Sequence, residues 1–379
     1  MNDPVYLDYN ATTPVAPEVA DAIEPYLREH FGNPSSSHIF GQRAKAAVEQ
    51  ARGEVAALIG ARPEEIVFTG CATEANNLAI LGTARALAGT KRHLITSAIE
   101  HPSVMQPFLK LREEGWEVTI LPVDRNGRVS PIAVERAIRP DTALVSIMHA
   151  NNEVGTIQPI AEIAQITRPK GILLHTDAAQ SAGKIPVHVY KLGVDLLTLA
   201  GHKFHAPKGV GALFVRNGTP LAPLQAGAGH EHGLRPGTEN VPFIVGLGAA
   251  AKLSRKRLTK AQAYLKTLRD RLHAQLRAGV PHLALNGHAE ARLPNTLNVS
   301  FPGVSGHELL EMAAQDVAAS TGSACHSGDH AVSGVLGAMR VSAVRASGAV
   351  RLSVGIYTTS ADIDRAARAL IAAWKVLHV

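Results

Sequence analysis

The sequence predicts an α/β fold, and three features point to it. Between about residues 60 and 215, short runs rich in Val, Ile and Leu alternate with helix-like stretches rich in Ala, Glu and Arg. This alternation is typical of a mainly parallel sheet covered by helices. A long helical pattern follows, and the rest of the chain mixes strands and helices as a smaller α+β domain does. In a parallel sheet, ligands bind beyond the carboxyl ends of the strands.

The expected elements follow one another in chain order. Strands are expected at residues 66–68, 93–96, 118–121, 143–147, 172–175 and 196–199, because each is a short apolar run. A helix is expected over residues 239–277, which contain few helix breakers. The smaller domain is expected to hold strands at 296–301 and 350–354 and helices at 307–314 and 361–377.

The length and composition indicate a soluble globular protein of two domains. Hydrophobic residues make up 46% of the chain and charged residues 18%, which is ordinary for a soluble protein. A chain of 379 residues is long for one compact core. We therefore place a larger domain at residues 15–255 and a smaller one at residues 1–14 and 256–379, which would carry the loop around Cys325.

Charge and cysteine content narrow the compartment and the partners. The net charge is +6, but Lys and Arg are spread along the chain and form no arginine-rich arm, so direct nucleic-acid binding is not expected. The densest basic run, residues 252–260, fits the wet face of a helix, with an acidic partner or RNA as the alternative. Two cysteines are too few for a disulfide framework. With neither a secretory signal pattern nor a membrane-spanning apolar run, the chain is expected to be cytoplasmic.

Two charged residues follow strand ends. Lys203 comes after the strand at 196–199, where a lysine can form a Schiff base if its amine is positioned and partly desolvated. A solvated surface lysine is the alternative. Asp177 follows the strand at 172–175, where a carboxylate could hold the protonated nitrogen of a pyridine cofactor or simply cap a helix.

Two further segments follow earlier strands. Residues 69–77 combine a strand end, small residues and a helix start, so free backbone N–H groups and the hydroxyl of Thr73 could bind an anion. An ordinary capped helix is the alternative, and the Gly-Lys-Ser/Thr ending of a Walker loop is missing. His101 could lie over an aromatic ring and move protons, or could be structural.

Cys325 is a candidate nucleophile. Small residues surround it, which is typical of a loop, and a neighbouring imidazole at His326 would favour the reactive thiolate. A zinc site with His326 and His330 is an alternative, although adjacent Cys and His side chains seldom point at one ion. A buried, inert cysteine is the other alternative.

Taken together, the sequence resembles the NifS/IscS-type cysteine desulfurases. These belong to the class V aminotransferase family of fold-type I enzymes, which use pyridoxal 5′-phosphate (PLP). The resemblance runs nearly end to end through short motifs whose order and spacing are specific: residues 6–13, 32–36, 72–77, 100–102, 151–155, 176–180, 201–203, 207–211, 235–240, 322–325 and 351–353. It implies a mainly parallel, seven-stranded sheet in the larger domain.

The resemblance implies a role for each position around the cofactor ring. Lys203 would carry PLP, and Asp177 would face the pyridine nitrogen. His101 would stack on the ring and assist proton transfer. Asn152 and Gln180 would contact the region of the 3′-oxygen.

It also implies how the phosphate and the substrate are held. Ala72, Thr73 and His202 would bind the phosphate. Thr238 would reach the phosphate of the neighbouring subunit in a homodimer. Arg351 would bind the carboxylate of the substrate, with help from Asn33.

The implied activity is removal of sulfur from L-cysteine, which leaves L-alanine and a persulfide on Cys325. The sulfur would pass to an acceptor protein, either an iron–sulfur scaffold or a tRNA-thiolation enzyme. No resident metal is expected, although Cys325 could ligate a transient iron–sulfur cluster. The alternatives are a selenocysteine lyase, another class V aminotransferase, or a non-catalytic protein without PLP.

Several positions depart from the family pattern. Ala200 replaces the usual Ser three residues before the lysine, which removes one phosphate hydroxyl. Cys71 stands where the family has Gly, and residues 229–232 replace a more usual Gly-Gln-Glu-Arg run. Ser333 is followed by Gly334 rather than His. None of these changes removes a group that the chemistry requires.

Overall fold

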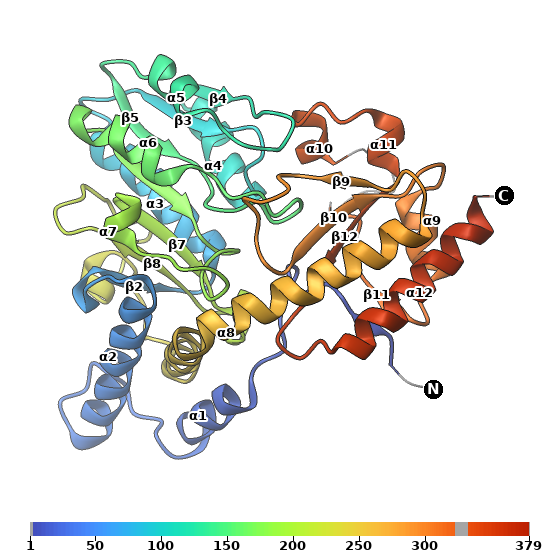
Figure 1. The fold of residues 1–379 in the computed structure, drawn as a ribbon. Coiled ribbons are helices and arrows are strands. Elements are labelled where there is room, and N and C mark those ends of the chain that lie inside the picture. The colour runs from blue at the N-terminus through green and yellow to red at the C-terminus, as the bar shows by residue number, and fades with distance from the viewer. Residues whose placement is uncertain (1–2, 323–332, 379) are drawn as a thin grey trace.

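A seven-stranded sheet forms the centre of the larger part of the molecule (Figure 1). The computed structural model describes residues 3–322 and 333–378. The strand order is β2-β8-β7-β6-β5-β3-β4. The strands are β2 (Ile66–Thr69), β3 (His93–Ser97), β4 (Glu117–Leu121), β5 (Thr142–Ser146), β6 (Leu173–Asp177), β7 (Leu196–Ala200) and β8 (Gly211–Val215). The predicted fold class is confirmed.

One strand of this sheet runs opposite to its neighbours. Strands β3 to β7 pair in parallel, whereas β8 is antiparallel to both β2 and β7. Six of these strands lie within about two residues of the apolar runs expected from the sequence, whereas β8 was not predicted. Two reversals make β2 parallel to β7, so the carboxyl ends of β2, β3, β6 and β7 share one edge.

Helices cover both faces of this sheet, so its strands are buried on both sides. Phe68 and Leu197 belong to one apolar cluster, and their neighbours Val67 and Leu196 belong to another. Burial on both sides explains the continuous apolar runs in the sequence. The helices of this part are α1 (Pro17–Arg28), α2 (Ile39–Ile59), α3 (Ala72–Leu87), α4 (Pro102–Glu113), α5 (Pro131–Ala137), α6 (Ile160–Thr167) and α7 (Val189–Leu192), with single turns η1 (Pro63–Glu65), η2 (Arg168–Lys170), η3 (Gly201–Lys203) and η4 (Glu231–Gly233).

Helix α8 (Val241–Gly279) joins the larger part to the smaller part, as Figure 1 shows. Its first turns bury Leu247 in the same cluster as Phe68. Its last turns bury Leu265 and Leu272 in a separate cluster of the smaller part. The single predicted long helix is therefore confirmed, while the exact domain boundary at residue 255 stays a prediction.

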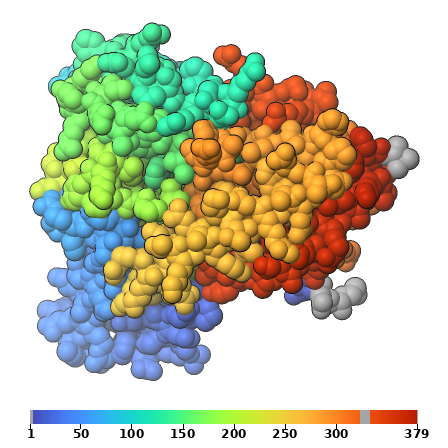
Figure 2. Space-filling model, viewed as in Figure 1, coloured from blue at the N-terminus to red at the C-terminus, as the bar shows by residue number. Residues whose placement is uncertain are grey.

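The smaller part is built on a three-stranded antiparallel sheet of order β12-β10-β9. These strands are β9 (Ala284–Asn286), β10 (Thr296–Ser300) and β12 (Ala349–Ser353), and β1 (Val5–Tyr6) pairs in parallel with β11 (Val317–Ala318). The helices are α9 (Gly306–Met312), α10 (Gly334–Ala338), α11 (Ala343–Ser347) and α12 (Ser360–Leu377). Figure 2 shows α8 and α12 side by side on the near face of this part. Over the described residues, no helix combines the length and the apolar character that crossing a membrane requires.

Candidate active site

The site lies at the sheet edge where β2, β3, β6 and β7 end. Asp177 is the last residue of β6, and Lys203 ends the single turn η3 directly after β7. His101 precedes α4, four residues beyond the end of β3, and Ala72 begins α3 just beyond β2. The four predicted positions therefore meet at one edge because their strands run in the same direction.

The Lys203 amine is held by two backbone carbonyls of the N-terminal segment. Its Nζ donates to the oxygen of Asn10 at 2.8 Å and to that of Ala11 at 2.7 Å. Burial and, after it, the positive charge of Arg351 lower the pKa of Lys203 to about 8, against the opposing charges of Asp177 and Asp8. The amine is thus close to the point where it can release and accept protons at neutral pH.

Asp177 is buried and held by two donors. Its Oδ2 accepts a hydrogen bond from Asn76 Nδ2 at 2.8 Å, and its Oδ1 accepts one from the backbone of Ala179 at 2.9 Å. The second contact is the capping interaction considered in the sequence analysis, and the first shows that capping is not its whole role. Asp177 and Lys203 influence each other electrostatically but form no ion pair in the described structure. The charges therefore lie near each other without touching.

His101 is connected to Asp177 through a chain of hydrogen bonds. Its Nδ1 accepts from the backbone N–H of Ser103 at 3.1 Å and lies 2.8 Å from Ser103 Oγ. Ser103 Oγ also accepts from Asn76 Nδ2 at 2.9 Å. Because a backbone N–H can only donate, the proton of the neutral ring lies on Nε2. Surrounding protein lowers the pKa of His101 although the residue is partly exposed; the charge of Asp177 opposes this shift and that of Lys203 adds to it.

The start of α3 supplies free backbone N–H groups beside Ala72 and Thr73. Cys71 caps this helix, because its Sγ accepts from the backbone of Glu74 at 3.5 Å. A Cβ on Gly211, the first residue of β8, would lie only 3.0 Å from the nitrogen of Ala72. The close approach of β8 to the helix start explains why glycine occupies that position.

His202 lies beside the same region in an uncharged form. Its Nδ1 is 3.2 Å from Thr12 Oγ1. Burial, and after it the positive charge of Lys203, lowers the pKa of His202 to about 4. His202 can therefore offer a hydrogen bond to a phosphate but not a positive charge.

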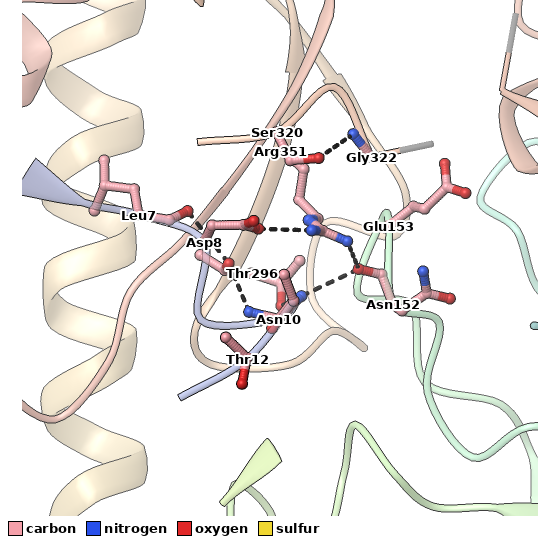
Figure 3. A network of polar contacts seen from close by, with 12 residues as sticks. Leu7, Asp8, Asn10, Thr12, Asn152, Glu153, Thr296, Ser320, Gly322 and Arg351 are labelled. Carbon is pink, nitrogen blue, oxygen red and sulfur yellow. Dashed lines mark hydrogen bonds and ion pairs between the residues drawn. The ribbon is translucent and has the colours of Figure 1, made fainter. Parts of the chain in front are cut away.

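Arg351 from β12 points toward Asp8 and Asn152, as Figure 3 shows. Its guanidinium forms an ion pair with Asp8 at 2.6 Å and donates to the carbonyl of Asn152 at 3.1 Å. Its Nε is buried and has no partner among the described residues. One donor of the guanidinium is thus free for a carboxylate, while Asp8 occupies another.

Asn10 connects these groups and was not singled out from the sequence. Its carbonyl accepts from both Lys203 Nζ and Gln180 Nε2, and its amide contacts Asn152 and Asn295 (Figure 3 shows the contact to Asn152). Asn10 lies in one of the family motifs, but no local pattern marks it. The same holds for Asn76, whose partners are far away in the sequence.

Two predicted residues, Asn33 and Thr238, form no contact with this cluster in the described chain. Asn33 is exposed and accepts a hydrogen bond from the backbone of Ser35 at 2.9 Å. Thr238 is exposed just before α8. Neither forms a hydrogen bond with the site residues described above. Cys325 lies outside the described residues.

The donor set fits PLP. An amine and a carboxylate face the same space from separate strands, a helix start offers N–H groups, and the Nε of Arg351 is an orphaned buried donor. A pyridine ring, its phosphate and a substrate carboxylate have the complementary chemistry.

The fold and site define the class of fold-type I PLP enzymes. The chain belongs to the aminotransferase class-V family, whose model matches residues 5–366. A protein named cysteine desulfurase IscS from Dictyoglomus turgidum is 47% identical over 96% of this chain and 93% of its own length. A solved structure named NifS-like protein is 39% identical with a TM-score of 0.91, and covers 99% of both chains. A structure of SspA in complex with cysteine is 38% identical with a TM-score of 0.82, over 93% of this chain and 99% of that one. The resemblance to NifS/IscS-type cysteine desulfurases is confirmed.

Proposed function

We propose that this protein is a PLP-dependent cysteine desulfurase that converts L-cysteine into L-alanine and leaves the sulfur on Cys325. The observation that carries the proposal is the meeting of Lys203, Asp177 and His101 at one sheet edge, with an amine whose pKa is lowered to about 8. Relatives of nearly the same length that bear this name support the choice of reaction.

The chain's own groups hold the cofactor. Lys203 would bind it covalently, and Asp177, held by Asn76, would face its pyridine nitrogen. The N–H groups of Ala72 and Thr73, with neutral His202, bind the phosphate, and Gln180 and Asn152 border the 3′-oxygen. When bound, PLP draws electrons from the substrate α-carbon.

Lys203 and His101 move the protons. The carbonyls of Asn10 and Ala11 hold the free Lys203 amine, and they would keep it beside the substrate whenever it is not bound to the cofactor. Its lowered pKa lets it take up the α-proton and return it. His101 has its Nε2 proton available for a second transfer.

Arg351 binds the substrate carboxylate. Its buried Nε has no partner among the described residues, and the substrate carboxylate would compete with Asp8 for the guanidinium. Asn33 assists from the loop before α2. A two-pronged guanidinium suits a carboxylate better than an ammonium group does.

Sulfur transfer needs no outside oxidant. The thiolate of Cys325 forms a bond with the substrate sulfur while the bond from that sulfur to the β-carbon breaks. The electron pair stays on carbon, which gains a proton and becomes the methyl group of L-alanine. The persulfide then passes to an acceptor, an iron–sulfur scaffold or a tRNA-thiolation enzyme, in the cytoplasm.

The site is completed in a homodimer. Phe31 and Phe40 are 75% and 47% exposed and stack on each other with ring centres 5.6 Å apart. Leu27 and Ile39 beside them are also exposed, and a patch of this kind marks an interface. Thr238 would then reach the partner's phosphate. Light scattering should show a dimer, and Phe31→Glu with Phe40→Glu should yield monomers that bind PLP more weakly.

An assay of sulfide and alanine from L-cysteine tests the activity. The wild type should form both, whereas Lys203→Ala and Cys325→Ser should form neither above background. Alanine formation by Cys325→Ser at the wild-type rate would favour an aminotransferase-like reaction, which does not need the thiol. Activity with selenocysteine alone would favour the lyase.

A further inference from the structure

Lys184 is a buried lysine that the proposed reaction does not use. It lies in the turn after β6 and is 7% exposed. It forms no ion pair with an acidic residue in the part of the chain that the structure describes. Burial, and after it the charges of Lys203 and Arg351, lowers its pKa well below the ordinary value. Burying an amine without an acidic partner costs free energy unless the amine forms hydrogen bonds.

Its hydrogen bonds go to residues that border Lys203. Lys184 Nζ donates to Gln180 Oε1 at 2.8 Å and to Asn10 Oδ1 at 3.3 Å. Gln180 Nε2 donates to the carbonyl of Asn10 at 2.9 Å, and the same oxygen accepts from Lys203 Nζ at 2.8 Å. Lys184, Gln180 and Asn10 therefore form a closed ring of contacts on one side of the Lys203 amine.

This ring fixes which way the Gln180 amide points. The carbonyl of Asn10 can only accept, so the NH₂ group of Gln180 must face it. The amide oxygen then faces Lys184, which supplies its donor. One hydrogen of the NH₂ group remains for a group in the site. Without Lys184, the buried oxygen would lack a partner and the amide would lose its fixed position.

We propose that Lys184 is a positioning residue, which sets the Gln180 amide and the Asn10 carbonyl beside the Lys203 amine. The inference rests on the proposed function, in which Gln180 would donate to the 3′-oxygen of bound PLP. Lys184 Nζ forms its hydrogen bonds with Gln180 and Asn10, so it would act through them. A cavity of about 40 Å³, lined by Lys184 and Lys203, adjoins the ring of contacts and leaves room for an uncharged side chain.

Lys184→Met in the PLP-loaded enzyme tests the inference by spectroscopy. Methionine keeps the length and removes the donor. A donor to the 3′-oxygen stabilises its deprotonated form, so weakening that donor should raise the pH midpoint of the cofactor absorption change by about 0.5 to 1 pH unit. The matched control is Lys170→Met, an exposed lysine at the end of η2, which should leave the midpoint unchanged.

A double-mutant cycle separates positioning from a general structural role. Gln180→Leu should raise the midpoint, and Lys184→Met added to it should cause no further rise, because Lys184 acts through Gln180. Additive shifts, or an unchanged midpoint in Lys184→Met, would overturn the inference. If Lys184→Met does not fold, Lys184→Gln serves in its place, since it keeps a donor group and should shift the midpoint less than Gln180→Leu.

The outcomes also separate this inference from the function. A wild type that binds no PLP would contradict the proposed function itself. If the wild type binds PLP and every Lys184 variant keeps the wild-type pH midpoint of the absorption change, only the role of Lys184 is contradicted.

Discussion

The Lys203 amine illustrates how neighbours set the chemistry of one residue. Burial and Arg351 favour its neutral form, while Asp177 and Asp8 favour the charged form. The result is a pKa of about 8 in a protein that would work near neutral pH. The carbonyls of Asn10 and Ala11 hold the amine in place without a negative charge that would keep it protonated.

The lowered pKa of Lys203 predicts a pH-dependent stability of the protein without PLP. Between pH 8 and the ordinary lysine value of about 10.4, the unfolded chain binds a proton that the folded chain does not, so stability rises with pH across this window. Below pH 8 the full cost, at most about 3 kcal/mol, is present. Lys203→Met should therefore gain stability over wild type more at pH 7.5 than at pH 10, as measured by urea unfolding. An equal difference at both pH values would contradict this.

Asp177→Asn should nearly abolish activity while the protein still folds. The amide keeps the shape but cannot hold a protonated pyridine nitrogen, so kcat should fall by about 10²-fold or more. Steady-state alanine formation and the cofactor spectrum would measure it. Asp195→Asn, a change on the far end of β7 from the site, is the control and should retain most of the activity.

Among the elements, the strands were predictable and the connections between them were not. Apolar runs marked six strands because both faces of the sheet are buried. Strand β8 starts at Gly211, the last residue of the family motif at 207–211, and no strand was expected there. Its pairing with β2 and β7 defines it. Asp177, Lys203 and His101 could be predicted because ligands bind beyond the carboxyl ends of parallel strands.

The supporting residues of the site left no such pattern. Asn10 and Gln180 are 170 positions apart, and Asn76 and Asp177 are 101 apart. A hydrogen bond between segments so distant has no periodicity in the sequence. The ion pair between Arg351 and Asp8, which are 343 positions apart, was hidden for the same reason.

Strand β6 contains a buried histidine that predicts acid sensitivity. His175 lies between Ser146 Oγ at 2.7 Å and Thr198 Oγ1 at 3.1 Å, and burial lowers its pKa to about 4. Between about pH 6.5 and 4, the unfolded chain binds a proton that the folded chain does not, so stability falls as pH falls. His175→Gln should flatten this dependence in urea unfolding from pH 7 to 5. A slope as steep as in wild type would show that other groups cause it.

A buried ion pair fixes the loop that carries Thr238. Glu231 accepts from Arg52 at 2.8 Å through both oxygens and from the backbone of Phe68 at 2.7 Å. Glu231→Ala would remove the buried carboxylate that both terminal nitrogens of Arg52 contact, would leave only the half-exposed Glu49 paired with the Arg52 Nε, and should cost about 3–5 kcal/mol. Chemical denaturation would measure this loss. The exposed pair of Glu18 and Arg257 is the matched control, and Glu18→Ala should cost no more than about 1 kcal/mol.

At the scale of the whole molecule, α8 makes the two parts depend on each other. The two tryptophans report on them separately, since Trp116 packs in the larger part and Trp374 in the smaller. Leu272→Ala removes buried side chain in the smaller part and should cost about 2–5 kcal/mol. Trp116→Phe leaves Trp374 as the reporter, and Trp374→Phe leaves Trp116. In both backgrounds, Leu272→Ala should lower the unfolding midpoint measured by fluorescence by the same amount. A shift of the Trp374 signal alone would mean that the parts unfold independently.

The same helix constrains which insertions and deletions this chain can accept. Each residue of an α-helix turns the following ones by about 100° around the axis. Losing one residue in the exposed stretch between Leu253 and Leu265 would swing Leu265 and Leu272 out of their cluster while Leu247 stayed in place. Adding four would rotate them by only about 40° but move the smaller part about 6 Å outward, away from Lys203. The number of residues in this linking stretch is therefore as closely determined as the identity of any side chain in the site.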